Sequence, residues 1–396
     1  MLTLKNDHIN LEQMLVEEGV YKLTAAGNIP LDLFRSTEQR HNPRAQMNID
    51  VDFNEADLAA LTAFKEVEWG IGKTEGKVKI AGTLETPHLY GNLGIKDGTV
   101  KFRDIYTPVD KINANIVFAG QKIDINRVSA VLGRGTVEGS GTYDLMATDA
   151  NAYRLEAKAN SAEIDSSYFK GRINGTFSAA PEYFRSRSRK QAGWRPKVTA
   201  DIRLDDVLIN MPTIPQMSGG DSNLGLDVTL ALGPKIRLYN KYLYDLWLKG
   251  GLKITGSTVF PRIEGSIESE KGTVTYLRTR FKLDKGSLNW IEPGTFLPNL
   301  RVNAHTRFSR YRVFMELTGP LSEDNLNLVL RSDPPLPQNT LVRMLTLQRL
   351  SAGSDDVTNE DLHNLLIAGL ETGLLGDVEY MVKKVLGIDD FRVYVG

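Results

Sequence analysis

The segment Gly72-Lys73-Thr74 is the stretch of the sequence that comes nearest to a nucleotide-binding motif. In a phosphate-binding loop, backbone N–H groups and a lysine hold the phosphates, and the motif needs a glycine five residues before Gly72. Val67 occupies that position, and the residues that follow alternate like a strand, whereas the motif opens a helix. The glycines of residues 133–139 miss a dinucleotide-binding spacing by one residue. We therefore expect no nucleotide cofactor.

Side chains suited to acid–base, nucleophilic or metal chemistry are few and badly spaced. The histidines show no H-x-H or H-x-x-x-H pairing, so His88 and His305 are interpreted as residues on strand surfaces. No Gly-x-Ser-x-Gly nucleophile elbow occurs. Asp205 and Asp206 are adjacent, so on a regular strand they would face opposite ways and could not share a proton. The sequence thus predicts a protein that is not an enzyme, with no cofactor and no metal site.

The composition excludes further classes of protein. The chain has 396 residues, a net charge of −1 and no cysteine. No basic face extends over a domain, so binding to nucleic acid is not expected, and disulfides and thiol nucleophiles are excluded. No stretch approaches the ~20 apolar residues of a membrane-spanning helix, and residues 1–7 do not look like a signal peptide. These features fit either a cytosolic protein or a piece whose targeting end lies upstream.

Residues 185–190, Arg-Ser-Arg-Ser-Arg-Lys, form the one dense basic run, and Tyr183, Phe184 and Trp194 flank it. The simpler interpretation is a polar loop between strands. The alternative is a contact with lipid headgroups, which basic residues near a membrane surface favour.

Alternation of apolar and polar residues is the dominant pattern of the chain. In residues 226–230, for example, Leu226, Val228 and Leu230 alternate with Asp227 and Thr229. This period of two predicts strands with one buried face and one wet face. Glycines recur about every 10 to 15 residues, which indicates an antiparallel meander of roughly twenty strands between residues 4 and 331.

The alternation assigns residues to the two faces of these strands. The residues expected to face inward and to line a lipid groove are Ile112, Ile116, Phe118, Ile123, Ile125, Ile202, Leu204, Leu226, Val228, Leu230, Leu326 and Leu328. Those expected to face outward are Asp124, Asn126, Arg203, Asp227 and Asn327. A slip of one residue would reverse a whole strand, so the assignment is specific.

Helices are expected at few places. One is predicted over residues 55–65, with Asn54 as N-cap and apolar residues three apart. The Pro-rich residues 332–337 then end the sheet. Beyond them the pattern predicts a helix over residues 338–350, a second that starts at Thr358, a third over residues 377–386 and a final strand over residues 391–395. Leu341, Leu345, Leu362, Leu366 and Leu370 are expected to cap the end of the groove.

An internal repeat supports a sheet built from similar units. Residues 82–100 and 256–274 share glycine, proline and Gly-Thr-Val anchors without a gap, at a constant offset of 174 residues. The alternative is chance recurrence of a Gly-x-Pro turn. With so few helices to cover it, a long sheet must curl on itself, and it then either packs shut as a sandwich or stays open as a trough. We expect two regions, residues 1–331 with the repeated β units and residues 332–396 with the turn, helices and strand.

Three segments together resemble the C-terminal region of the TamB family, in the AsmA-like superfamily. They are the strands of residues 256–290, residues 298–321, and the Ser-Asp-Pro-Pro-Leu turn of residues 332–336 with the leucine-rich helix after it. The residues that carry the family motifs are Gly265, Gly272, Gly286, Ser332, Asp333, Pro334 and Pro335.

The resemblance implies a mostly β fold, an elongated antiparallel sheet curled into an open trough (a β-taco), with a small C-terminal helical segment. It implies an envelope protein that moves phospholipid or other acyl-chain cargo between the inner and outer membranes, with an outer-membrane barrel protein as partner. It also implies the periplasmic part of a protein held by an inner-membrane anchor, and no such anchor is visible in this chain. Relatives usually continue beyond the position of Gly396 into further strands that resemble barrel strands.

Two other functions compete with the lipid conduit. The first is a periplasmic scaffold that assists outer-membrane protein insertion and autotransporter assembly through a free strand edge, for example that of residues 391–395. The second is a carbohydrate-active β-solenoid, which would need clustered carboxylates and stacked aromatic residues, whereas the four tryptophans are dispersed.

Overall fold

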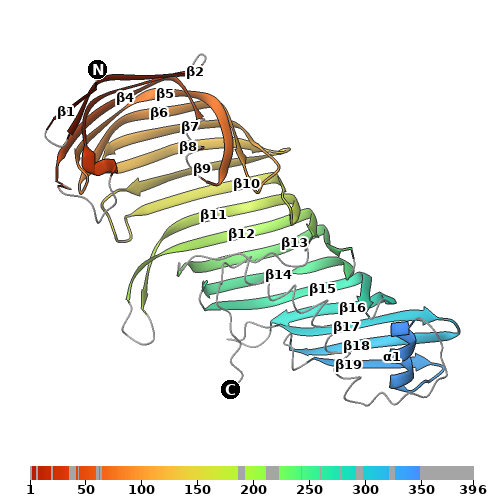
Figure 1. Ribbon diagram of the computed structural model, residues 1–396. Coiled ribbons are helices and arrows are strands. Elements are labelled where there is room, and N and C mark those ends of the chain that lie inside the picture. Colours follow the sequence, from red (N-terminus) through yellow and green to blue (C-terminus); the bar gives the residue numbers. More distant parts are fainter. Residues whose placement is uncertain are drawn as a thin grey trace. The chain divides into compact units, whose positions relative to one another are not determined.

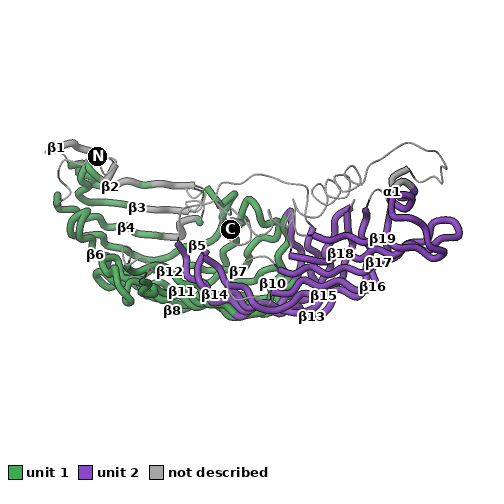
Figure 2. The backbone as a smooth tube through the Cα atoms, turned by 90° about the horizontal axis from the view of Figure 1, so that it is seen from below, with its two compact units in different colours: residues 1–166, 172–200 green, residues 167–171, 201–396 purple. Residues whose placement is uncertain are grey.

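The structure is a computed structural model. It describes residues 2–5, 8–18, 21–34, 42, 44–58, 62, 65–185, 192–210, 223–241, 243–258, 260–276, 279–290, 298–320 and 326–347. The chain divides into two compact units, the first of residues 1–166 and 172–200 and the second of residues 167–171 and 201–396 (Figure 2).

Unit 1 is a meander of antiparallel strands (Figure 1). Its strands are β1 (Leu2–Lys5), β2 (His8–Glu18), β3 (Tyr21–Pro30), β4 (Gln46–Asp57), β5 (Val67–Thr83), β6 (Pro87–Phe102), β7 (Val109–Gly120), β8 (Lys122–Leu132), β9 (Gly135–Asp144) and β10 (Tyr153–Asp165), with a short 3₁₀ turn, η1 (Leu31–Phe34). From β1 to β10 each strand pairs antiparallel with the next. The unit also holds most of β11 (Phe169–Arg185) and the first half of β12 (Ala192–Asn210).

Unit 2 repeats this arrangement and adds a helix. Its strands are β13 (Gly225–Asn240), β14 (Tyr244–Ser257), β15 (Pro261–Tyr276), β16 (Thr279–Trp290), β17 (Asn299–Phe308), β18 (Tyr311–Pro320) and β19 (Asn327–Asp333), followed by α1 (Gln338–Leu347). Each strand from β13 to β19 pairs antiparallel with the next. Within the described residues the fold is mostly β with very little helix, and the sheet stays open and does not close into a barrel. The predicted fold class, an open curled antiparallel sheet, is confirmed.

Tight turns make the meander possible. Gly120 and Gln121 connect β7 to β8, and Gly133 and Arg134 connect β8 to β9, as two-residue hairpin loops. Gly120 has φ +74° and Gly133 has φ +61°, values that side-chain-bearing residues adopt only with strain. Of the glycines in residues 133–139, which miss a dinucleotide-binding spacing, Gly133 lies in this hairpin loop, and Gly135 and Gly139 lie on β9.

The two copies of the sequence repeat form the same turn, one in each unit. Gly82 pairs with Pro87, and Gly256 pairs with Pro261. The two glycines have nearly the same φ, +90° and +92°. A Cβ on Gly82 would lie 2.4 Å from a backbone oxygen, and one on Gly256 2.5 Å, so both positions require glycine.

The predicted helix over residues 55–65 is wrong where the structure describes it. β4 continues to Asp57, because Ala56 and Asp57 still pair with β5. Leu58 then turns onto the sheet and is 5% exposed, in a cluster with Val67 and Val100. Strand pairing and this single apolar anchor outweigh the helical spacing.

The helix predicted over residues 338–350 is confirmed as α1, of which Gln338–Leu347 are described. Its first turn closes with the N–H of Leu341 donating to the carbonyl of Pro337 at 3.1 Å. The predicted helix from Thr358, the predicted helix over residues 377–386 and the predicted strand over residues 391–395 lie outside the described residues, as do Leu362, Leu366 and Leu370.

Candidate functional site

The ladder register shows which side chains share a face. Residues directly opposite each other in an antiparallel pair point to the same side of the sheet. Following the pairs from β4 to β10 therefore traces rows of side chains across seven strands. We define the first apolar row as Phe53, Gly76, Leu93, Ile116, Ile125, Gly141 and Leu155.

A neighbouring row on the same face is also free of charge. It consists of Val51, Val78, Gly91, Phe118, Ile123, Tyr143 and Tyr153. Four of the predicted groove residues, Ile116, Phe118, Ile123 and Ile125, thus lie on one face of unit 1. Each of the four is half-buried, which is intermediate between a closed core and a solvated surface.

The opposite face of the same strands is polar. Its row consists of Asp52, Lys77, Asn92, Val117, Asp124, Thr142 and Arg154. Lys77 contacts Asp52 at 2.7 Å, and this hydrogen bond raises the pKa of Lys77. The two faces of unit 1 therefore differ sharply in polarity, and Asp124 lies on the polar one, as predicted for an outward residue.

Bulges keep the two faces separate where the alternation in the sequence breaks. In β8 the register shifts between Ile125 and Val128, so that Asn126 and Arg127 are both exposed. In β7 a similar shift surrounds Lys111, whose φ is +49°, and Ile112 then pairs with Gly98. Ile112 packs beside the cluster that Leu58 anchors.

The predicted groove residues of β12 lie in the part that belongs to unit 2. Leu204 is buried, Ile202 is half-buried and Arg203 is exposed. Asp206 has φ +56°, so regular alternation ends there. Asp205 and Asp206 both lie on β12, as expected, but the strand is irregular at Asp206.

Unit 2 carries a comparable face. We define the second apolar row as Ile236, Leu248, Ser269, Gly286, Val302, Leu317 and Leu328, which crosses β13 to β19. Its single polar member, Ser269, donates its hydroxyl to the carbonyl of Lys271 at 3.2 Å. Among the predicted residues, Leu328 belongs to this row and is 8% exposed.

The predicted residues of β13 lie in pairs on the same apolar face. Leu230 pairs with Leu252, and Val228 pairs with Ile254. Both predicted residues are half-buried, as is Leu226 opposite Gly256.

The alternate residues of β13 face the other way. Thr229 pairs with Lys253, whose ammonium group lies 3.3 Å from the Thr229 hydroxyl and 2.5 Å from a carboxylate oxygen of Asp227. Near β19, Leu326 is half-buried and Asn327 is exposed.

Helix α1 covers part of the apolar face of unit 2. Leu341, Val342, Met344 and Leu345 are buried in one cluster with residues of β15 to β19, including Phe281. The predicted cap residues Leu341 and Leu345 thus pack on the sheet, and each is 0% exposed. The helical spacing did not single out Val342 or Met344, since contacts across long sequence separations decide their burial.

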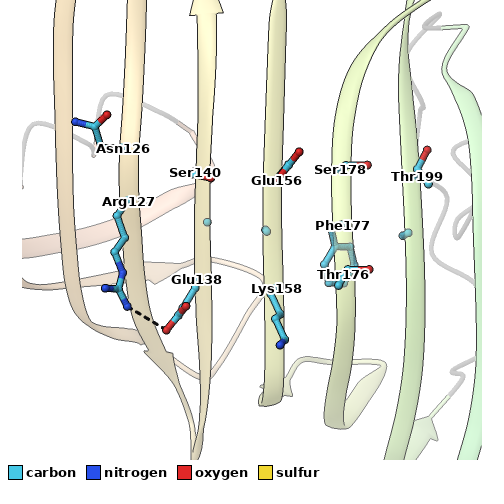
Figure 3. Close-up of a pocket in the computed structure, with 13 residues that line it drawn as sticks. Asn126, Arg127, Glu138, Ser140, Glu156, Lys158, Thr176, Phe177, Ser178 and Thr199 are labelled. Atoms are coloured by element: carbon cyan, nitrogen blue, oxygen red, sulfur yellow. Dashed lines mark hydrogen bonds and ion pairs between the residues drawn. The ribbon is translucent and has the colours of Figure 1, made fainter.

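Polar side chains of the types used in catalysis are spread over the described surface. His305 lies 2.8 Å from a carboxylate oxygen of Asp284, which is the extra residue of a bulge in β16. Figure 3 shows an open depression on β8 to β12 in unit 1, lined by side chains such as Glu156, Lys158 and the ion pair of Arg127 with Glu138 at 3.3 Å. No group of three or more metal-ligating side chains occurs in the described part of the chain.

The TamB C-terminal domain model matches residues 16–396. The chain belongs to the TamB family. A comparison with curated proteins found no match. TamB-family proteins are envelope proteins linked to lipid transport or to outer-membrane protein assembly, and the family is not a known enzyme family.

The family motif residues occupy defined places in unit 2 of this TamB-family chain. Gly265 and Gly272 lie on β15 and Gly286 on β16, whereas Ser332 and Asp333 end β19. The hydroxyl of Ser332 donates to the carbonyl of Pro334 at 2.8 Å, which helps to end the strand. Pro335 follows as an exposed residue. Among the described residues, no helix is both long and apolar enough to cross a membrane.

Proposed function

We propose that this TamB-family chain carries phospholipid between the inner and outer membranes, with the acyl chains held against the apolar faces of its two units. The observation that supports the proposal is the first apolar row, seven successive strands without a polar side chain. The half-burial of Leu93, Ile116 and Ile125 leaves apolar surface that cargo can cover.

The energetics fit a carrier of acyl chains. Exposing a chain of about 16 carbons to water costs roughly 12 kcal/mol, at about 0.8 kcal/mol per methylene group. Strands lie about 4.8 Å apart, so a row across seven strands extends for roughly 30 Å. An apolar face of this length removes the cost without tight or specific binding. Glycines in the row, such as Gly76 and Gly141, leave room beside the larger side chains.

The remaining features belong to the same proposal. The cargo is phospholipid or another acyl-chain lipid, and no cofactor or catalytic residue takes part. The chain acts as the periplasmic part of an inner-membrane-anchored protein, with an outer-membrane barrel protein as partner.

A photocrosslinking experiment at two adjacent residues tests the conduit. Val228 pairs with Ile254 on the apolar face, whereas Thr229 pairs with Lys253 on the polar face. A photoreactive residue at position 228 should label phospholipid in cells, and one at position 229 should not. Equal labelling at both positions, or no labelling at either, would contradict the conduit. Labelling of nascent outer-membrane protein in place of lipid would favour the scaffold.

A further inference from the structure

The ends of β11 and β12 carry an exposed aromatic pair that the lipid-carrying faces do not explain. Tyr183 is 55% exposed and Trp194 is 42% exposed. Their rings meet edge to face with centroids 5.5 Å apart, so the two strands lie side by side here. Both residues belong to unit 1. Large aromatic side chains left this exposed indicate an interaction surface.

Charged residues next to the aromatic pair form ion pairs and a cation–π contact. Glu182 accepts hydrogen bonds from Arg195, with a shortest N···O distance of 2.5 Å, and lies 3.1 Å from the ammonium group of Lys197. The Arg195 guanidinium also lies over the ring of Phe184, 5.1 Å from its centroid. These contacts fix the strand ends and neutralise only one of the two cations. Arg185 is exposed beside them.

The local charge is opposite in sign to that of the chain. The described residues 182–185 and 192–197 contain three basic residues and one acidic residue, a net charge of +2, whereas the whole chain has a net charge of −1. A positive segment in a nearly neutral protein selects an anionic partner.

The combination of aromatic and basic side chains indicates which anionic partner. Tyrosine and tryptophan favour the interface between water and lipid, where the ring is buried and its polar atom stays hydrated. Basic residues near an anionic bilayer each contribute to binding through the surface potential. We propose that the β11–β12 end binds the surface of a bilayer that contains anionic phospholipid, with Tyr183 and Trp194 at the headgroup level. Neither apolar row includes a residue of β11 or β12, so this proposal goes beyond the proposed lipid-carrying function.

Vesicle co-sedimentation of the full chain tests the proposal. The protein should bind vesicles of phosphatidylcholine with about a quarter phosphatidylglycerol more tightly than vesicles of phosphatidylcholine alone, and added salt should weaken the binding. Arg185→Gln should weaken it about fivefold, the loss expected for one basic residue at the surface. The double substitution Tyr183→Ala, Trp194→Ala should weaken it further. Phe260→Ala is the matched control, because Phe260 is also a highly exposed aromatic residue, 79% exposed, but belongs to unit 2.

Quenching of tryptophan fluorescence by brominated phosphatidylglycerol tests directly whether Trp194 contacts the lipid. The wild-type protein should lose tryptophan fluorescence on these vesicles, and Trp194→Phe should remove most of the quenching. Equal binding to both kinds of vesicle, or unchanged binding and quenching in the β11–β12 variants, would overturn the proposal.

A second variant separates this contact from the lipid-carrying function. Ile116→Lys alters the first apolar row, far along the chain from residues 183–194, and should leave binding to anionic vesicles unchanged. Vesicle binding lost in Ile116→Lys but kept in the Tyr183→Ala, Trp194→Ala variant would show that the apolar face binds the vesicles, which overturns the proposed contact and leaves the proposed function standing.

Discussion

Adjacent residues with the same chemistry can have opposite roles in this protein. Ile116 and Val117 are both aliphatic and both half-buried. Ile116 pairs with Leu93 and belongs to the first apolar row, whereas Val117 pairs with Asp124 in the polar row. The difference lies in the register of the ladder and not in the residue type.

Alternation predicted the shared face of Ile116, Phe118, Ile123 and Ile125 because no bulge interrupts these short runs. At Asp206 a residue other than glycine adopts a positive φ, and the alternation of faces is interrupted there. Alternation in the sequence gives no signal of such a local change in backbone conformation.

The ion pair of Arg237 with Asp245 should make the stability of unit 2 depend on pH. Two parallel hydrogen bonds, of 2.7 and 2.8 Å, join the guanidinium to both carboxylate oxygens. Hydrogen bonding by Arg237 lowers the pKa of Asp245 below its ordinary value, against the opposing effect of burial. The ionised carboxylate therefore stabilises the fold above the ordinary pKa of about 4, and this contribution is lost as the pH falls through the lowered value.

Thermal unfolding of the wild type and of Asp245→Asn checks this dependence. We expect the wild type to melt at a higher temperature at about pH 7, with the difference shrinking as the pH approaches about 3. A difference in melting temperature that stayed constant over this range would show that the carboxylate's charge is not what stabilises the fold.

At the scale of the elements, the strands could be predicted from the sequence, but the structure of the segment that begins at residue 55 could not. The alternation that predicted strands is strong in β13, where aliphatic residues occupy every second position. Residues 55–65 have helical spacing as well, but β5 offers Ala56 and Asp57 ladder partners that only the folded sheet supplies. A prediction from the spacing of residues within one segment cannot include pairing with β5. Helix α1 was predictable because the prolines before it end the sheet and its apolar residues lie on one side.

Truncating the buried face of α1 should destabilise unit 2. Leu341 and Leu345 are each 0% exposed and pack in one cluster with Phe281 and Val313. Leu345→Ala should lower the free energy of unfolding by about 2 to 5 kcal/mol, the usual cost of a leucine-sized cavity. Exposed apolar surface should also increase the binding of a hydrophobic dye.

The matched control for the helix is Gln338→Ala. Gln338 is exposed in the first turn of α1, so its truncation should change the stability little. Chemical denaturation with dye binding measures both effects. A Leu345→Ala protein as stable as the control would mean that α1 does not contribute to the core of unit 2.

At the scale of the whole molecule, the fold class could be predicted from the sequence, but the boundary between the two compact units could not. The repeat at residues 82–100 and 256–274 corresponds to one hairpin in each unit, and the turns at Gly82 and Gly256 have the same conformation. No composition change marks the division, which passes through β11 and β12 themselves. A boundary within strands depends on how densely the neighbouring strands contact each other, which alternation and turn signals do not encode.

The presence of an apolar face in each unit leads to a prediction about transport. If one route uses both faces, a charge in either should block it, because an acyl chain cannot solvate an ammonium group. Ile116→Lys places the charge in unit 1, and Leu252→Lys places it opposite Leu230 and Gly265 in unit 2. Each single variant should stop most transfer of labelled phospholipid from donor to acceptor vesicles. The double variant should transfer as much as either single variant, because the second charge blocks a route that is already blocked.

Matched variants on the polar face separate this effect from general damage. Val117→Lys places the new charge opposite Asp124, and Thr255→Lys places it opposite Asp227, so both should transfer lipid at the wild-type rate. The pattern among the variants distinguishes a shared route from two independent carriers. Independent carriers would each lose only their own share, so the single variants would retain partial transfer and the double variant would lose both shares. A shared route has no such partial state, because lipid that cannot pass one face never reaches the other.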